Sequence, residues 1–194
     1  RYPDPGFAHQ GMSAKPYITA RVLDDGTTQV DTTEYNSLGK PIRTVDPVGR
    51  NMIYLYDSTQ INLLEIRQTT KGANELLGQY TYNDKHQPLT SKDASGQLTT
   101  FVYNPKGQIT KVTNPRNETT TFNYDSSNYL TSIVGPVAGT TVRFSYDGFG
   151  RVRTITDQEG YAITTDYDAL DRPTVITYPD SPYEQSVYDR LDAV

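Results

Sequence analysis

The feature that most constrains this chain is a tyrosine followed by Asn or Asp, which returns at nearly constant spacing. The gaps between successive copies are 21, 26, 21, 21, 22, 21 and 21 residues. We call these residues the anchor tyrosines: Tyr35, Tyr56, Tyr82, Tyr103, Tyr124, Tyr146, Tyr167 and Tyr188. Such a period is typical of repeat proteins, in which one small unit is copied and stacked against its neighbours.

The residues that follow each anchor predict a hairpin turn. Asn and Asp side chains bond to the backbone two residues on and so begin turns; those after the anchors are Asn36, Asp57, Asn83, Asn104, Asp125, Asp147, Asp168 and Asp189. Four residues after the anchors stand Gly39, Gln60, His86, Gly107, Asn128, Gly150, Asp171 and Asp192. Apart from Gln60, these types tolerate positive φ, which a hairpin loop that ends in a left-handed residue requires.

A second turn is predicted further along the repeat. It has the form Asp/Asn-x-x-Gly/Asn and begins at Asp46, Asp93, Asn114 and Asp157. This form indicates a type I or type II turn. Each repeat is therefore expected to contain two short strands and two turns.

The strand before each anchor is rich in Thr and aromatic residues. Two residues before the anchor, on the same predicted sheet face, stand Tyr54, Tyr80, Phe101, Phe122 and Phe144. Apolar residues also recur six residues after the anchor (Ile109, Leu130, Val152) and nine after it (Val112, Ile133, Ile155, Ile176). The odd spacing between those two sets predicts a bulge or a turn-end position. We interpret the aromatics as one face of a sheet, with a ligand-stacking row as the alternative.

The regularity fails in two places. Residues 1–32 are expected to be an irregular N-terminal segment with a degenerate hairpin around Asp25-Gly26, and residues 33–194 about eight repeats. The 26-residue gap contains an insertion within Glu65–Gln79, which we expect to project as a longer loop.

Eight repeats of two strands predict an all-β protein of about sixteen strands. Open sheets rarely exceed about ten strands without curling, so the prediction is a curved, spiralling antiparallel sheet that forms part of a hollow shell. The hydrophobic fraction is only 35%, which suits a wall wetted on much of its surface.

Composition excludes several partners. The net charge is −5, from 18 Lys+Arg against 23 Asp+Glu, and no basic cluster stands out, so nucleic acid is not expected. There is no Cys for a disulfide or a thiolate metal site. The sequence contains no run of about eighteen apolar residues, so no membrane-spanning helix is predicted.

No catalytic, cofactor or metal site is predicted. His86 falls at a turn position and His9 lies in a segment without pattern. The carboxylates recur once per repeat, as Asp147 and Asp168 do, whereas catalysis needs singular residues in unlike environments. The Asp-containing turns also lack the dense alternating oxygen ligands of a calcium loop.

The unit Y-D/N-x-x-G, followed by a D-P-x-G turn and a Thr-rich strand, resembles the YD repeat of the rearrangement-hotspot (Rhs) family. The match is close over Tyr146–Pro173 and extends over about residues 33–192. The family includes polymorphic toxins, the B and C components of insecticidal toxin complexes, wall-associated proteins and teneurins. The resemblance implies a β-sheet cocoon in a secreted or cell-surface protein, with neighbouring repeats and a C-terminal toxin of the same parent chain as partners. The family's C-terminal core segment with its self-cleavage site is missing here, so neither that site nor toxicity carries over.

Three functions follow from these observations. The first is a non-enzymatic wall segment that encloses a C-terminal cargo polypeptide. The alternative is a carbohydrate-binding, adhesive cell-surface module whose aromatics stack on glycans. The third is an enzyme that uses carboxylates such as Asp147 and Asp168.

Overall fold

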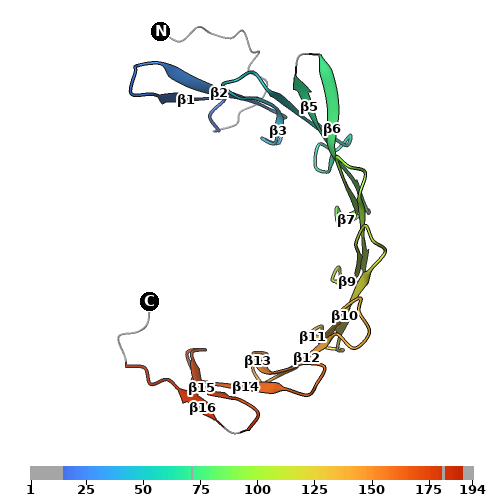
Figure 1. Cartoon of the computed structure of the whole chain (residues 1–194), viewed down its shortest axis with the longest axis vertical. Coiled ribbons are helices and arrows are strands. Elements are labelled where there is room, and N and C mark those ends of the chain that lie inside the picture. Colours follow the sequence, from blue (N-terminus) through green and yellow to red (C-terminus); the bar gives the residue numbers. More distant parts are fainter. Residues whose placement is uncertain (1–14, 71, 181, 190–194) are drawn as a thin grey trace. The chain divides into compact units, whose positions relative to one another are not determined.

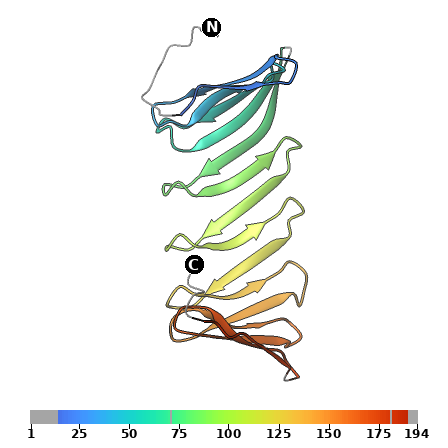
Figure 2. The same cartoon turned by 90° about the vertical axis from the view of Figure 1, so that its left-hand side faces the viewer.

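The computed structural model describes residues 15–70, 72–180 and 182–189, and contains strands and turns but no helix in that part of the chain (Figures 1 and 2). The N-terminal residues 1–14, with His9, and Asp192 near the C-terminus lie outside the described residues. The chain divides into two compact units, residues 1–100 and 101–194, which we call unit 1 and unit 2.

Unit 1 is a set of antiparallel strands, each paired with the next strand in the chain. They are β1 (Ile18–Val22), β2 (Thr28–Tyr35), β3 (Pro41–Val45), β4 (Asn51–Tyr56), β5 (Leu63–Thr70), β6 (Ala73–Tyr82), β7 (Pro88–Asp93) and β8 (Leu98–Tyr103), the last of which ends just past the unit boundary. Strands β1 and β2 join through a turn at Asp25-Gly26, within the segment where the sequence suggested an extra hairpin.

Unit 2 repeats the same pattern. Its strands are β9 (Ile109–Thr113), β10 (Thr119–Tyr124), β11 (Leu130–Val134), β12 (Thr141–Tyr146), β13 (Val152–Thr156), β14 (Ala162–Tyr167), β15 (Pro173–Thr177) and β16 (Tyr183–Gln185). Within this unit the strands follow a bowed line (Figure 1). The predicted all-β architecture of tandem antiparallel hairpins is confirmed; a hollow, spiralling shell stays a prediction.

Most of the anchor turns, and the second turns that begin at Asp46, Asp93, Asn114 and Asp157, are built alike. The amide of the Asx residue donates to the carbonyl four residues on, and the amide three residues on donates back to the Asx carbonyl, as Asp147, Gly150 and Arg151 do. The fourth turn residue has positive φ, including Gln60 (62°), the one residue whose type did not predict it. At the second turns it is Gly49, Gly96, Asn117 or Gly160 that has positive φ, so these are type I turns followed by a left-handed residue.

A β-bulge lies at the start of the strand after the anchor, as the odd spacing of apolar residues predicted. Tyr146 pairs with Val152 while Ser145 pairs with Thr154, which leaves Arg153 as the extra residue. Equivalent register shifts place an extra residue at Ile42, Leu64, Leu89, Thr131 and Thr174. Because of the bulge, the anchor pairs with the first residue of the next strand, while the side chains of the remaining pairs still alternate between the two faces of the sheet.

The insertion within Glu65–Gln79 does not form the longer loop that the sequence suggested. It lengthens the hairpin, because β5 has eight residues and β6 has ten, against five or six in most other strands. One further residue is absorbed at Asp57, whose amide bonds to the carbonyl of Asn62. Thr69 and Thr70 favour strand structure, and pairing them with Asn74 and Ala73 satisfies backbone groups that a loop would leave to water.

The two faces of the sheet in unit 2 differ in polarity. Register places apolar side chains of consecutive strands side by side on one face, and we call this set the apolar row: Phe122, Ile133, Val142, Phe144, Ile155 and Ile163. The opposite face carries Asn123, Ser132, Arg143 and Thr156 in adjacent positions. No described hydrophobic side chain is buried, so the described part of the chain has no packed core of the usual kind.

Candidate functional site

Five of the anchor tyrosines join their repeat to the one before it. Their hydroxyls donate to backbone carbonyls 15 to 19 residues earlier, at O–O distances of 2.8–3.0 Å: Tyr35 to Pro16, Tyr124 to Ile109, Tyr146 to Leu130, Tyr167 to Val152 and Tyr188 to Pro173. In unit 2 these acceptors are the first residues of β9, β11, β13 and β15. The anchor therefore reaches back across its own hairpin boundary to a fixed backbone atom.

Partial burial favours the neutral phenol at four of the anchors. Desolvation raises the pKa of Tyr146, and in the same way the pKa values of Tyr56, Tyr82 and Tyr103. The neutral phenol is the form that can donate a hydrogen bond.

The Asx residues hold the turns through their side chains as well. In the turn after Tyr167, Oδ1 of Asp168 accepts the amides of Leu170 (2.8 Å) and Arg172 (3.0 Å). The same pair of bonds is made by Asn36, Asn83, Asn104, Asp125 and Asp147 among the predicted motif residues. Bonds of this kind lower a carboxyl pKa, because they favour the ionised form.

Two of these carboxylates show the effect clearly. The backbone amide of Arg172 is the main cause of the lowered pKa of Asp168. At Asp57 the hydroxyl of Thr59 donates at 2.6 Å and is the main cause of a pKa lowered to about 2. At neutral pH these two carboxylates are therefore ionised and accept hydrogen bonds in their turns. An ionised carboxylate has no proton to donate as a general acid.

In four repeats the residue five positions after an anchor lies against the ring of the next anchor. Lys40 Nζ is 5.7 Å from the centroid of the Tyr56 ring. The guanidinium carbons of Arg151 and Arg172 are 4.7 and 4.3 Å from the centroids of Tyr167 and Tyr188. At the same position Tyr129 contacts Tyr146, with ring centroids 4.7 Å apart. We call this line of contacts, together with the anchor hydroxyl bonds, the inter-repeat seam.

Arg151 shows the fullest version of the seam. Its Nε pairs with Asp147 Oδ2 (2.7 Å) in its own turn. Its Nη1 donates to the carbonyl of Asp168 (2.8 Å) and pairs with Asp171 Oδ1 (2.8 Å) in the next turn. The side chain is only 19% exposed. One residue thus connects two turns and one anchor ring.

Sequence reasoning missed this position. The residues five after the anchors are Lys40, Ile61, Gln87, Gln108, Tyr129, Arg151 and Arg172. Gln108 also bridges repeats, since its Nε2 donates to the carbonyl of Asn128 at 2.8 Å. Long polar or aromatic side chains in six of seven repeats were the available signal, but the contact partner sixteen residues on depends on the register.

The remaining predicted motif residues lie in the turns. Gly39, Gly107 and Gly150 have φ of 71°, 86° and 82°. His86 occupies the same position with φ of 61°, and its Nδ1 is 3.1 Å from Oδ1 of Asn62 in the preceding turn. The carbonyl of Asp189, next to Tyr188, lies 3.4 Å from Nη1 of Arg172.

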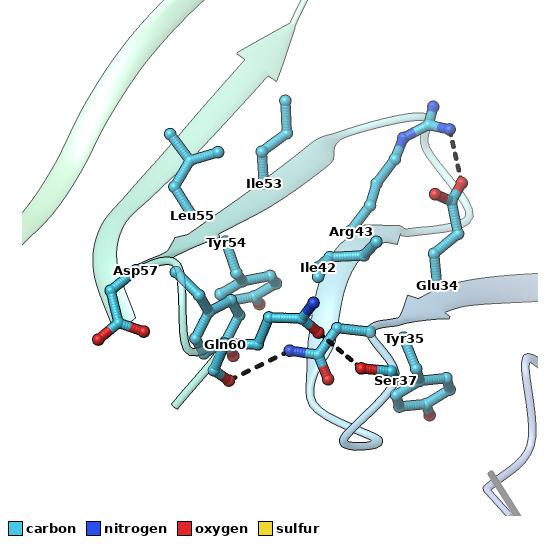
Figure 3. A pocket seen from close by; sticks show the side chains of 12 residues that line it. Glu34, Tyr35, Ser37, Ile42, Arg43, Ile53, Tyr54, Leu55, Asp57 and Gln60 are labelled. Atoms are coloured by element: carbon cyan, nitrogen blue, oxygen red, sulfur yellow. Dashed lines mark hydrogen bonds and ion pairs between the residues drawn. The ribbon is translucent and has the colours of Figure 1, made fainter. Parts of the chain in front are cut away.

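A groove of about 680 Å³ lies in unit 1 where two successive anchor turns meet (Figure 3). Two bonds cross it, from Asn36 Nδ2 to the carbonyl of Gln60 (3.3 Å) and from Ser37 Oγ to Gln60 Oε1 (2.9 Å). Figure 3 shows Ile53 and Leu55 on one side of β4 and Tyr54 on the other. The lining side chains therefore do not converge on one ligand.

The described residues contain no group of three or more His, Asp or Glu side chains placed to hold a metal ion. The described part of the chain has no helix long and apolar enough to cross a membrane. What the arrangement does chemically is couple neighbouring hairpins through repeated hydrogen bonds and ring contacts.

Fold and seam together define a tandem β-hairpin repeat protein. A family model described as RHS Repeat matches residues 82–119, 103–137, 124–162 and 146–182, which is more than half of the chain. The chain therefore belongs to the RHS-repeat family. No curated protein matches it.

Solved structures share the fold. The crystal structure of TcdB2-TccC3-Cdc42 matches with a TM-score of 0.66 and 16% identity, over 80% of this chain and 9% of that chain. The Photorhabdus luminescens Tc holotoxin pore matches with a TM-score of 0.67 and 16% identity, over 84% of this chain and 10% of that chain. The crystal structure of TcdB2-TccC3 without its hypervariable C-terminal region matches with a TM-score of 0.64 and 16% identity, over 80% of this chain and 9% of that chain. The chain thus spans about a tenth of the length of these structures.

Proposed function

We propose that this chain is a non-enzymatic wall segment of an Rhs-repeat shell, and that the shell encloses a C-terminal polypeptide cargo of the same parent chain. The observation that carries the proposal is the inter-repeat seam in a sheet whose described hydrophobic side chains are all at least partly exposed. A protein built this way gains stability from each neighbouring repeat, so it can extend as a wall without a central core.

The comparisons support a role of this class. The similar structures are toxin-complex components, and one of them is described by a hypervariable C-terminal region. A variable C-terminal polypeptide is the kind of cargo that we propose for the parent chain. On the same grounds we propose a secreted parent protein.

Limited proteolysis of the parent chain tests the proposal. In the intact protein, the region C-terminal to the repeats should resist a protease that cleaves the same region expressed alone. A variant with a broken seam, Arg151→Ala with Tyr167→Phe, should lose part of this protection. Cleavage of the C-terminal region at equal rates in both contexts would contradict encapsulation.

The adhesive alternative makes a different prediction. The aromatic and aliphatic row of unit 2 is partly exposed, with Ile155 at 44%, and could contact sugar rings. The chain has no Trp, so Tyr fluorescence follows binding directly. A saturable change in Tyr fluorescence on titration with a panel of saccharides would favour adhesion over encapsulation. No change in fluorescence with any saccharide of the panel would exclude the adhesive alternative.

We also propose that Asp147 and Asp168 have no catalytic role, since each accepts two backbone amides and pairs with an Arg. Replacing both with Asn keeps the turn acceptors. It should leave any activity of the parent chain unchanged, and a large loss of activity in a folded double variant would contradict this.

A further inference from the structure

One contact in the inter-repeat seam joins two phenols. The ring of Tyr129 packs against the ring of Tyr146, with centroids 4.7 Å apart and planes inclined by 33°. At the same position the next two repeats carry Arg151 and Arg172. A guanidinium can only contact the anchor ring, whereas a second phenol can also react with it. The pair therefore has a chemistry that the cationic contacts of the seam lack.

Hydrogen bonds hold the two rings in place. The hydroxyl of Tyr146 donates to the carbonyl of Leu130, the residue next to Tyr129, at 2.8 Å. The amide of Tyr129 donates to Oδ1 of Asp125 at 2.9 Å, and its carbonyl accepts the amide of Asp125 at 3.0 Å. Both rings are thus fixed to the same short segment of backbone. Two groups held in contact in this way react far more readily than two groups that must meet by diffusion.

The pair can also be reached from solvent. Tyr129 is 40% exposed, and Tyr146 is half-buried. The hydroxyl of Tyr129 lies over Gly150, where any side chain would take up the same space. An oxidant can therefore meet Tyr129 directly, and Tyr146 lies in contact with it.

The composition directs oxidation to tyrosine. Cys thiolates are the usual site of protein oxidation and of covalent ties between segments, but this chain has no Cys and no Trp. Its 16 Tyr therefore carry the groups most easily oxidised by one electron. A radical formed at Tyr129 would have the ring of Tyr146 against it.

We propose that Tyr129 and Tyr146 are a site of oxidative coupling, at which a dityrosine bond ties two successive repeats together. The oxidant is a haem peroxidase with hydrogen peroxide, which removes one electron and the hydroxyl proton from each phenol. The two radicals join through a bond between the ring carbons ortho to the oxygens. The hydrogens on those two carbons then move to the oxygens, which restores both phenols, and the peroxide leaves as two molecules of water. This inference does not depend on what the wall encloses.

Mass spectrometry of the oxidised parent chain tests the assignment. The chain is treated with a haem peroxidase and hydrogen peroxide and digested with trypsin, which cleaves after Arg116, Arg143 and Arg151. The expected product joins peptide 117–143 to peptide 144–151 and is lighter than their sum by two hydrogen atoms. A mixture of isotope-labelled and unlabelled chains distinguishes a bond within one chain from a bond between two copies.

Tyr129→Phe is the deciding variant, because it keeps a ring in contact with Tyr146 but cannot form a phenoxyl radical. The joined peptide should be lost in this variant. The matched control is Tyr161→Phe, which removes another phenol of unit 2 that is 48% exposed, and it should leave the yield unchanged. A joined peptide that persists in Tyr129→Phe would place the bond at Tyr124 of the same peptide and overturn the proposal. A native chain that gives no joined peptide, or joins only labelled to unlabelled copies, would overturn it as well.

Discussion

At the scale of single residues, the fold depends on a left-handed residue at the fourth position of each turn. Gly150 has φ of 82°, and a side chain added there would meet the hydroxyl of Tyr129, a residue of the seam. Both backbone conformation and space therefore restrict this position to glycine.

Gly150→Val should lower the free energy of unfolding by about 1–3 kcal/mol, because a β-branched side chain opposes positive φ. Equilibrium unfolding in urea measures the change. Gly148→Ala is the matched control, since it lies in the same turn, does not have positive φ, and has open space around it. Equal effects of the two substitutions would show that φ at position 150 does not limit stability.

Asp57 should make stability depend on acid pH. Its pKa falls from an ordinary value of 3.8 to about 2 in the folded chain. A lowered folded pKa adds stability that is present above the unfolded pKa and is lost as pH falls through the folded pKa. Thermal unfolding between about pH 5 and about pH 2 should therefore show a steeper loss for the native chain than for Asp57→Asn. Parallel curves would contradict the prediction.

How far the sequence predicts these residues depends on whether the cause is local. Turn positions such as Asn36 and Gly39 follow from side-chain chemistry within four residues, and the bulges follow from the odd spacing of apolar residues. Gln60 was not predicted to be left-handed, since its type gives no reason for it; the surrounding turn imposes the conformation. The contact of Arg151 with Tyr167 could not be predicted, because only strand register brings the two together.

At the scale of elements, hairpins are coupled by the seam rather than by a core. Within unit 2, Arg151 and Arg172 each hold their own turn and lie against the next anchor. Removing such a residue should weaken a boundary between two hairpins while the hairpins themselves remain.

A double-mutant cycle on Arg151→Ala and Tyr167→Leu should give a coupling energy of about 1–2 kcal/mol, above the value for an exposed cation–π contact, because the Arg151 side chain is only 19% exposed. Chemical unfolding of the native chain, the two single variants and the double variant measures this coupling energy. The control cycle combines Arg50→Ala with Tyr167→Leu and should give no coupling, because Arg50 pairs with Asp46 at a second turn. A cycle that closes to zero would show that the ring contact adds nothing.

The lengthened hairpin of β5 and β6 shows where prediction from sequence failed at this scale. The insertion was expected to be a loop because it interrupts the period. Its residues nevertheless pair across the hairpin, with a register shift between Ile66 and Arg67 that takes up the mismatch. The pairing satisfies backbone groups that a loop would leave to water, although Ala73, Asn74 and Glu75 are not strand-favouring types.

At the scale of the whole molecule, four of the anchor phenols make stability sensitive to alkali. The pKa of Tyr146 is raised by desolvation above its ordinary value of 10.0, as are those of Tyr56, Tyr82 and Tyr103. A raised folded pKa gives stability that is fully present below the unfolded pKa and is lost as pH rises through the folded pKa.

The melting temperature should therefore fall between about pH 9 and about pH 12, with a steepness that reflects several tyrosines together. Thermal scans followed by circular dichroism measure this fall. Tyr146→Phe should melt lower at neutral pH, since the bond to Leu130 is lost, and should show a shallower alkaline decline. An alkaline decline unchanged by this substitution would mean that Tyr146 does not contribute to it.

The hydroxyl bond from an anchor to a fixed backbone carbonyl has a consequence for how such chains can change in length. Tyr124 and Tyr146 are 22 residues apart rather than 21, yet both close onto the first residue of the preceding strand. Alignment is thus re-established at each anchor that makes this bond, and an added or deleted residue there disturbs only the repeat that contains it. Genes for such proteins can gain or lose whole copies, or tolerate local errors, without displacing what lies downstream.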